Sequence, residues 1–153
     1  MNSETLKFEF EFESVFWDKP PAVKINLDNA ECFQGLITAP VFTLYFFQDL
    51  ELDSPHRLQI IRYNKDDSQC QVVNGEPKDQ MLILRRVLID GIDLQNVVLS
   101  RSWYEPTYSE SYSEDRELET HVPGETWWGH NGIWNLEFRS PVWQWLIEDI
   151  WNG

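Results

Sequence analysis

The sequence predicts an all-β protein, a jelly-roll-like β-sandwich formed as a single domain over residues 1–153. Residues 6–13 alternate strictly between apolar and polar side chains, which is the period of a strand with one face in water. Short runs of strand character recur along the chain with turn signals between them, and no long helical pattern separates them. A chain of 153 residues is also long enough to bury a substantial hydrophobic core.

The expected strands are short runs rich in β-branched and aromatic residues. They cover residues 6–13, 23–27, 32–38, 41–47, 57–63, 81–89, 92–99 and 133–138. Asp28 and Asn29 are a turn signal, so the second and third runs are expected to form a hairpin. Asp90 and Gly91 favour a tight turn with positive φ, so the run after them is expected to pair with the run before them.

The last third of the chain has a different pattern. Residues 101–132 carry many aromatic side chains without a sustained period, and we expect one long loop there. Loops of that length inside a compact domain are usually functional or flexible. Ser140 and Pro141 then predict a short C-terminal helix over about 140–151, with Ser as the N-cap and Pro at the first helical position.

The composition limits the partners and the compartment. Twenty-six acidic residues against 12 basic ones give a formal net charge of −14, which repels phosphate backbones and anionic lipid headgroups. We therefore expect no nucleic-acid partner and no membrane insertion, since no apolar run approaches the ~20 residues of a spanning helix. The N-terminus lacks a secretory signal pattern, which favours synthesis in a cytoplasm. Cys32 and Cys70 are interpreted as reduced packing residues.

The sequence offers little support for an enzyme. Only His56, His121 and His130 are available as a base, and none lies in a nucleophile motif. No glycine-rich phosphate loop is present, and the spacing of histidines and cysteines does not suit zinc. No cofactor is therefore expected, except that the acidic turn with Asp66 and Asp67 is a candidate calcium cluster. The alternative is that this turn is simply solvated.

Aromatic side chains are the most distinctive feature. They make up 14% of the residues and include 8 Trp, more than packing alone requires. Trp143, Trp145 and Trp151 cannot all face one core at helical spacing, so at least one is expected to be exposed or covered by another chain. The candidate partner- or glycan-binding residues are Trp103, Tyr104, Trp127, Trp128 and Trp143. The alternative for Trp127 and Trp128 is that they cover an open end of the sandwich.

Four segments carry a resemblance to a known group of proteins. They are residues 57–68, 82–94, 138–146 and the tryptophan-rich run over 124–134. Together they resemble small β-sandwich proteins encoded among the virion genes of marine cyanobacterial tailed phages. This resemblance implies a non-enzymatic structural or accessory protein of the tail, neck or fibre-attachment region. Such a protein would be made in the host cytoplasm and would act in the virion by assembling with other virion proteins or with itself.

The sandwich pattern also resembles calcium-dependent carbohydrate-binding modules. This second resemblance implies that the same aromatic side chains stack on sugar rings of a host-surface glycan, with calcium held at Asp66 or Asp67. No ligand residue of those modules matches this sequence position by position. Glycan recognition is therefore the alternative to assembly within a virion.

Overall fold

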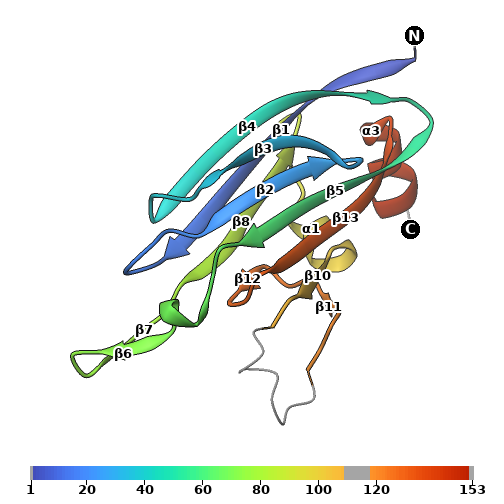
Figure 1. Ribbon diagram of the computed structural model, residues 1–153. Helices are drawn as coiled ribbons and strands as arrows, with labels where there is room; N and C mark the ends of the chain where they lie inside the picture. The colour runs from blue at the N-terminus through green and yellow to red at the C-terminus, as the bar shows by residue number, and fades with distance from the viewer. Residues whose placement is uncertain (1, 109–117, 152–153) are drawn as a thin grey trace.

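The computed structural model describes residues 2–108 and 118–151, and over these ranges the chain forms two antiparallel sheets (Figure 1). Sheet A has the order β12-β8-β1-β4, with β9 also paired to β8, and sheet B has the order β11-β10-β13-β5-β2-β3. Rings from the two sheets meet between them, as where Phe8 of β1 lies 6.2 Å from Phe138 of β13. The predicted all-β sandwich is therefore confirmed.

The strands and helices have the following bounds. Sheet A contains β1 (Ser3–Val15), β4 (Val41–Glu51), β8 (Met81–Ile89), β9 (Ile92–Asp93) and β12 (Trp127–Trp128). Sheet B contains β2 (Ala22–Leu27), β3 (Ala30–Leu36), β5 (Ser54–Tyr63), β10 (Trp103–Pro106), β11 (Val122–Pro123) and β13 (Gly132–Ser140). A separate hairpin contains β6 (Gln71–Val73) and β7 (Glu76–Lys78). The helical segments are η1 (Asp67–Gln69), α1 (Gln95–Arg101), α3 (Val142–Trp145) and η2 (Leu146–Trp151).

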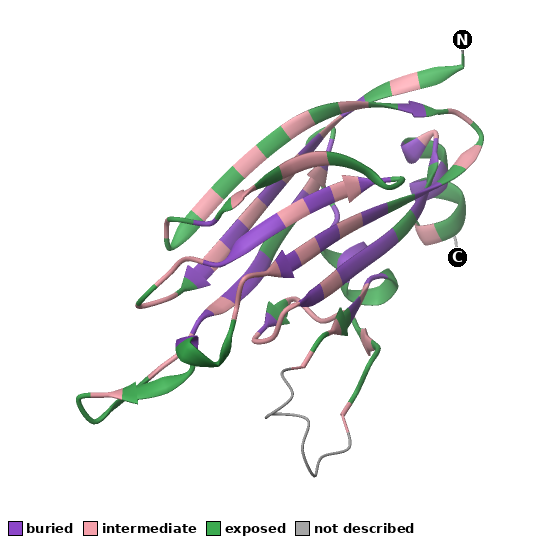
Figure 2. Ribbon diagram, viewed as in Figure 1, coloured by how far each residue is buried: buried purple, intermediate pink, exposed green. Residues whose placement is uncertain are grey.

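The alternation in β1 sets the orientation of sheet A. Leu6, Phe8, Phe10 and Phe12 are at most 2% exposed and face sheet B, while the residues between them face solvent. The buried residues in Figure 2 accordingly alternate along the strands that flank the core. Burial of four large apolar side chains from one strand is a dominant favourable term in folding. The N-terminal strand is thus as the sequence predicts.

The predicted turns are also confirmed. Asp28 and Asn29 join β2 to β3 with φ values of 51° and 68°. Asp90 and Gly91 follow β8 with φ values of 49° and 78°. Asn, Asp and Gly accept the left-handed region more readily than other residues, which is why these pairs mark tight turns.

Two sequence predictions for the central part of the chain are wrong. The run over 92–99 forms only the two-residue β9 and then α1, because Leu94, Val97 and Val98 reach the core at helical rather than strand spacing. The segment over 101–132 is not one loop, since it contains β10, β11 and β12. Its residues 109–117 lie outside the part of the chain that the structure describes.

The C-terminal helix begins later than predicted. Ser140 belongs to β13, and Pro141 is the N-cap without a side-chain capping bond. The Ser140 hydroxyl is directed instead to the Glu4 carboxylate, so it is not available as a cap. Val142 is buried against the core as expected, together with Trp145 and Leu146 of the same helical face.

The two cysteines have different surroundings. Both cysteines are free; Cys32 is half-buried and packs against the core, whereas Cys70 is exposed and has no packing role. Burial raises the pKa of the Cys32 thiol.

Within residues 2–108 and 118–151, no helix has the length and apolar character needed to cross a membrane.

Candidate functional site

The outer face of β4 carries more exposed large apolar side chains than any other strand that the structure describes. The exposed positions of this strand are Val41, Thr43, Tyr45, Phe47, Asp49 and Glu51, and we call the first four, which are uncharged, the aromatic row. Val41, Tyr45 and Phe47 are 62%, 64% and 60% exposed. The other side of β4 carries Phe42, Leu44 and Phe46, which pack against the core. Because both sides of β4 are apolar, burying one side leaves the other in water.

The two rings of the aromatic row contact each other and a cation. Tyr45 and Phe47 meet edge to face, with centroids 6.1 Å apart and an interplanar angle of 88°. The Lys7 ammonium lies 4.8 Å from the centroid of the Tyr45 ring and 3.4 Å from a carboxylate oxygen of Glu9. Lys7 therefore restrains both the Tyr45 ring of β4 and the Glu9 carboxylate of the neighbouring strand β1.

Charged side chains border the aromatic row on the same outer face. Glu9 and Glu11 of β1 lie directly opposite Tyr45 and Thr43 of β4, and Arg86 of β8 lies opposite Glu11. Next along, the Arg85 guanidinium forms an ion pair of 3.0 Å with Glu13. An apolar ring is thus placed beside acceptors and a donor, the arrangement of groups that fixes the orientation of a small polar ligand.

A shallow groove lies between these strands, with a volume of about 150 Å³. It is lined by Glu9, Phe10, Glu11, Thr43, Leu44, Tyr45, Arg86 and Leu88. We call it the sheet A groove. Its two carboxylates repel anions, while a neutral molecule with both an apolar surface and hydroxyl groups has complementary chemistry. The sheet A groove is therefore suited to a polyol.

The structure separates the predicted contact residues that reach the surface. Trp103 is half-buried on the outer face of sheet B, stacked on His121 at 5.6 Å with the Arg57 guanidinium 5.8 Å from its ring. Trp127 is 59% exposed on β12, the edge strand of sheet A opposite β4. Trp143 is 53% exposed on α3. No ring contact joins these three among the described residues, so they do not form one surface.

Tyr104 and Trp128 are not surface residues. Their rings stack at 5.1 Å with an interplanar angle of 9°, and they are 2% and 0% exposed. The Tyr104 hydroxyl donates to the His130 carbonyl at 2.6 Å, and the Trp128 indole donates to the Glu125 carbonyl at 2.9 Å. The prediction that these two rings contact a partner is therefore corrected. Trp128 instead covers the core, as in the alternative interpretation, and burial raises the pKa of Tyr104.

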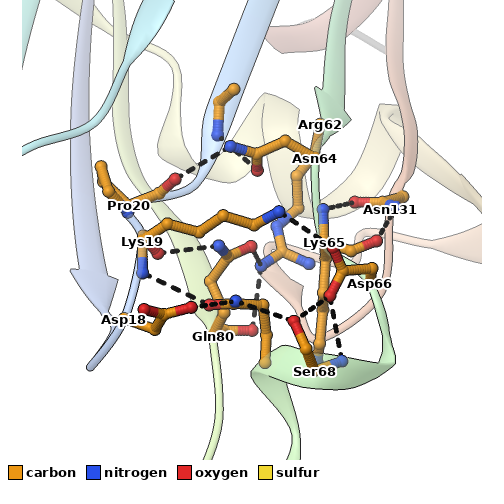
Figure 3. A network of polar contacts seen from close by, with 12 residues as sticks. Asp18, Lys19, Pro20, Arg62, Asn64, Lys65, Asp66, Ser68, Gln80 and Asn131 are labelled. Atoms are coloured by element: carbon orange, nitrogen blue, oxygen red, sulfur yellow. Dashed lines mark hydrogen bonds and ion pairs between the residues drawn. The ribbon is translucent and has the colours of Figure 1, made fainter.

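The candidate calcium cluster does not fit a calcium ion (Figure 3). One oxygen of Asp66 accepts hydrogen bonds from Ser68, and the other lies 3.0 Å from the Lys19 ammonium. These bonds lower the pKa of the Asp66 carboxyl. The amide oxygen of Asn64 accepts from the Ala22 backbone at 3.1 Å. Among the described residues, which include Asp66 and Asp67, no group of three His, Cys, Asp or Glu side chains could hold a metal ion.

Figure 3 also shows a hydrogen-bond network near Asp66 that is built around Arg62 and Gln80. The buried Arg62 guanidinium donates to the carbonyl and the side-chain oxygen of Gln80 at 2.9 and 3.1 Å. The Gln80 amide in turn donates to the Lys19 carbonyl at 2.9 Å. Burial lowers the pKa of Arg62 to about 10. This network joins β5 of sheet B to the start of β8 in sheet A, so its role is to hold one end of the sandwich together.

Sequence reasoning missed the residues of the sheet A groove. A signal was nevertheless present, because residues 41–47 are apolar at almost every position, whereas a strand at the edge of a solvated sheet usually alternates. The second part of the signal was that Glu9 and Glu11 of β1 alternate with apolar residues and so share one face of that strand. What the sequence does not show is that β4 pairs with β1 in the register that places Tyr45 beside Glu9.

Comparisons with known proteins give a likeness at the level of the fold. No protein-family model matches the sequence, and no curated protein matches it significantly. The solved structure of vCBM60 in complex with galactobiose superposes with a TM-score of 0.54 and 8% identity, over 85% of this chain and 96% of that chain. This chain therefore has a β-sandwich fold similar to that of a carbohydrate-binding module.

A second solved structure is similar over a comparable length. It is the SeMet form of vCBM60, described with two families of calcium-dependent carbohydrate-binding modules. Its TM-score is 0.48, with 10% identity over 86% of this chain and 89% of that chain.

Proposed function

We propose that this chain is a non-catalytic carbohydrate-binding module that holds a neutral sugar in the sheet A groove. The observation that carries the proposal is the exposed Tyr45–Phe47 ring pair beside the carboxylates of Glu9 and Glu11. The likeness in fold to vCBM60, which was solved with galactobiose, supports the same class of ligand.

Each side chain of the groove has a role that follows from its chemistry. The Tyr45 ring, one face of which carries the Lys7 ammonium, provides an apolar, rigid surface for the C–H face of a pyranose ring. Glu9 and Glu11 accept hydrogen bonds from sugar hydroxyl groups, and charged acceptors make the stronger bonds. Arg86 donates to a ring or hydroxyl oxygen. The formal charge of −14 makes a neutral sugar a better ligand than an acidic one.

The geometry of His56 does not suit a catalytic base. His56 is buried, and its Nδ1 lies 2.5 Å from the Asp28 carboxylate while its Nε2 lies 2.9 Å from the Glu51 carbonyl. Both ring nitrogens are therefore occupied by acceptors from the protein. A base for a ligand would need one nitrogen free to take a proton.

The test is binding of the purified chain to a panel of neutral oligosaccharides, followed by calorimetry on the tightest ligand. Tyr45→Ala is expected to weaken binding by about 30-fold, since removal of an aromatic hot spot costs ~2 kcal/mol or more. Trp127→Ala is the matched control, because this ring is equally exposed but lies on the opposite edge of sheet A. It is expected to bind like the wild type.

The outcomes separate the function from the site. A wild-type chain that binds no neutral sugar contradicts the proposed function. A chain that binds sugar equally well with Tyr45→Ala contradicts the sheet A groove and sends the search to Trp103. Calcium dependence stays a prediction of the sequence, and the same titration with and without a chelator measures it.

The assembly role in a phage particle also stays a prediction. One observation favours a protein partner: Trp143, Ile147 and Trp151 are 53%, 46% and 56% exposed on the C-terminal helical segment. The rings of Trp143 and Trp151 lie 6.3 Å apart, so they form one apolar face. Location in the virion would follow from such docking and is tested by mass spectrometry of purified particles.

A further inference from the structure

The free edge of β4 is an unpaired strand edge of unusual length. β4 lies at the end of sheet A and pairs only with β1, through an unbroken register from Ser3↔Glu51 to Glu13↔Val41. On its other side, no backbone hydrogen bond to another strand is formed over residues 41–50 within the described chain. Such a row of free N–H and C=O groups is a template for a further strand.

Residues 41–48 of this edge also lack the features that prevent an edge strand from pairing with another chain. Natural edges carry charges, proline or bulges. Residues 41–48 contain no Asp, Glu, Lys, Arg or Pro, although 25% of the residues of the chain are charged. The edge strand of sheet B is different: β3 has 7 residues against 11 in β4, and its pairing with β2 has a register shift, whereas the charged residues of β4, Asp49 and Glu51, lie only at its C-terminal end. Of these two edge strands, only β4 is free to pair with a further strand.

We propose that β4 pairs antiparallel with β4 of a second copy of this chain. A two-fold axis perpendicular to the sheet at Leu44 keeps the outer face of one copy continuous with the outer face of the other. In this register Tyr45 lies opposite Thr43 of the second copy, and Phe47 lies opposite Val41. Aromatic side chains opposite β-branched ones are favourable cross-strand pairs, and the same pairs form twice. The strand is thus complementary to itself.

The negative charge of the chain does not prevent this contact at physiological salt. The acidic residues of β1 in the two copies are separated by three strand spacings, roughly 14 Å at ~4.8 Å each. This distance exceeds the Debye length of about 8 Å at physiological ionic strength. The uncharged run over 41–48 forms the contact itself. Dimerisation is therefore expected to strengthen as salt is added, because salt screens repulsion but leaves the strand pairing.

The pairing goes beyond sugar binding, because it requires no ligand. It makes the two outer faces one continuous sheet, with two sheet A grooves on the same side. A dimer with two sites on one face binds a repeating glycan more tightly than a single site does.

The experiment is light scattering of the full-length chain from micromolar to near-millimolar concentration, at low and high salt. The expected mass rises from 18.2 kDa towards twice that value, at lower concentration when salt is added. Thr43→Lys and Val41→Lys place charges on the exposed edge and are expected to keep the chain monomeric. Val72→Lys is the matched control, since Val72 is a 70% exposed strand residue of β6, and it should dimerise like the wild type.

A second measurement uses the wild-type chain alone, so that a folding defect in a variant cannot obscure the result. Amide hydrogen exchange over residues 41–48 should slow as concentration rises, while exchange in β3 stays constant. A wild-type chain that remains at 18.2 kDa throughout overturns the proposal. A dimer that persists in both lysine variants, or that leaves amides 41–48 unprotected, overturns it too and points to the face around Trp143.

Discussion

Two pairs of aromatic rings differ in almost every respect that matters for binding. Tyr104 and Trp128 are stacked face to face at 5.1 Å and are at most 2% exposed. Tyr45 and Phe47 meet edge to face at 6.1 Å and are 64% and 60% exposed. The first pair lies in the part of the sequence richest in Trp, and the second lies in an ordinary strand. Whether a ring is accessible to a ligand thus depends on which side of its strand it lies, and not on how many aromatic residues are close to it in the sequence.

The adjacent residues Trp127 and Trp128 show the cause. Successive side chains of a strand point to opposite sides, so β12 buries one indole and exposes the other. Trp128 also contacts Phe12 of β1, with centroids 6.3 Å apart, which fixes it in the core. Identical side chains one position apart therefore have opposite roles.

The largest expected effect is on stability at Trp128. Replacement by Ala should lower the free energy of unfolding by about 3–5 kcal/mol, because it removes a large buried ring and leaves a cavity. Trp127→Ala should change it by less than about 0.5 kcal/mol. Urea denaturation of the two variants measures the difference. Equal losses would break the distinction between the buried and exposed rings.

A smaller effect is expected from one hydroxyl in each pair. Tyr104→Phe should cost about 1 kcal/mol, since the His130 carbonyl loses its hydrogen bond from the Tyr104 hydroxyl. Tyr45→Phe should leave stability unchanged, because Tyr45 is exposed to water that can replace any bond of its hydroxyl. The same denaturation experiment tests both. If Tyr45→Phe proved the more costly change, the exposed pair would have a structural role.

The smallest effect is a pH dependence beside the buried pair. Burial, together with the nearby charges of Lys65 and Arg62, lowers the pKa of His130 below 6.5 in the folded chain. The folded state then binds fewer protons than the unfolded state, so this contribution to stability is present above pH 6.5 and is lost as the pH falls through the folded pKa. The melting temperature of His130→Gln should therefore decline less between pH 7 and pH 5. Parallel curves for variant and wild type would refute this.

The sequence predicts the parts of the fold that depend on local pattern. The alternation over 6–13 and the turn pairs at Asp28 and Asp90 are read directly, since each reflects a local preference of the backbone. The strand expected over 92–99 is wrong because apolar and polar residues alternate there only as far as Gln95, whereas the buried Leu94, Val97 and Val98 have helical spacing. A strand and a helix both fit the first residues of so short a run. Packing decides between them, and packing is not local.

The candidate site was beyond local prediction for a similar reason. Tyr45 and Glu9 are far apart in sequence, and only the pairing of β4 with β1 brings them together. The buried position of Tyr104 depends on Gly132, where a Cβ would lie 2.7 Å from the Tyr104 ring and 2.6 Å from the Glu105 carbonyl oxygen. Close approaches of this kind follow from tertiary contacts and leave no periodic trace in the sequence.

The place of β5 in sheet B has a consequence for synthesis on the ribosome. β5 lies between β2 and β13, so one of its edges has no partner until residue 140 has been translated. At ~5–20 residues per second this interval lasts roughly 4–15 s. The β5-β2-β3 part of sheet B is complete once Tyr63 has been translated, and the three long strands of sheet A are complete once Ile89 has been translated. During this interval the backbone N–H and C=O groups on the β13 side of β5 have no partner strand, and this free edge is what a chaperone has most to protect.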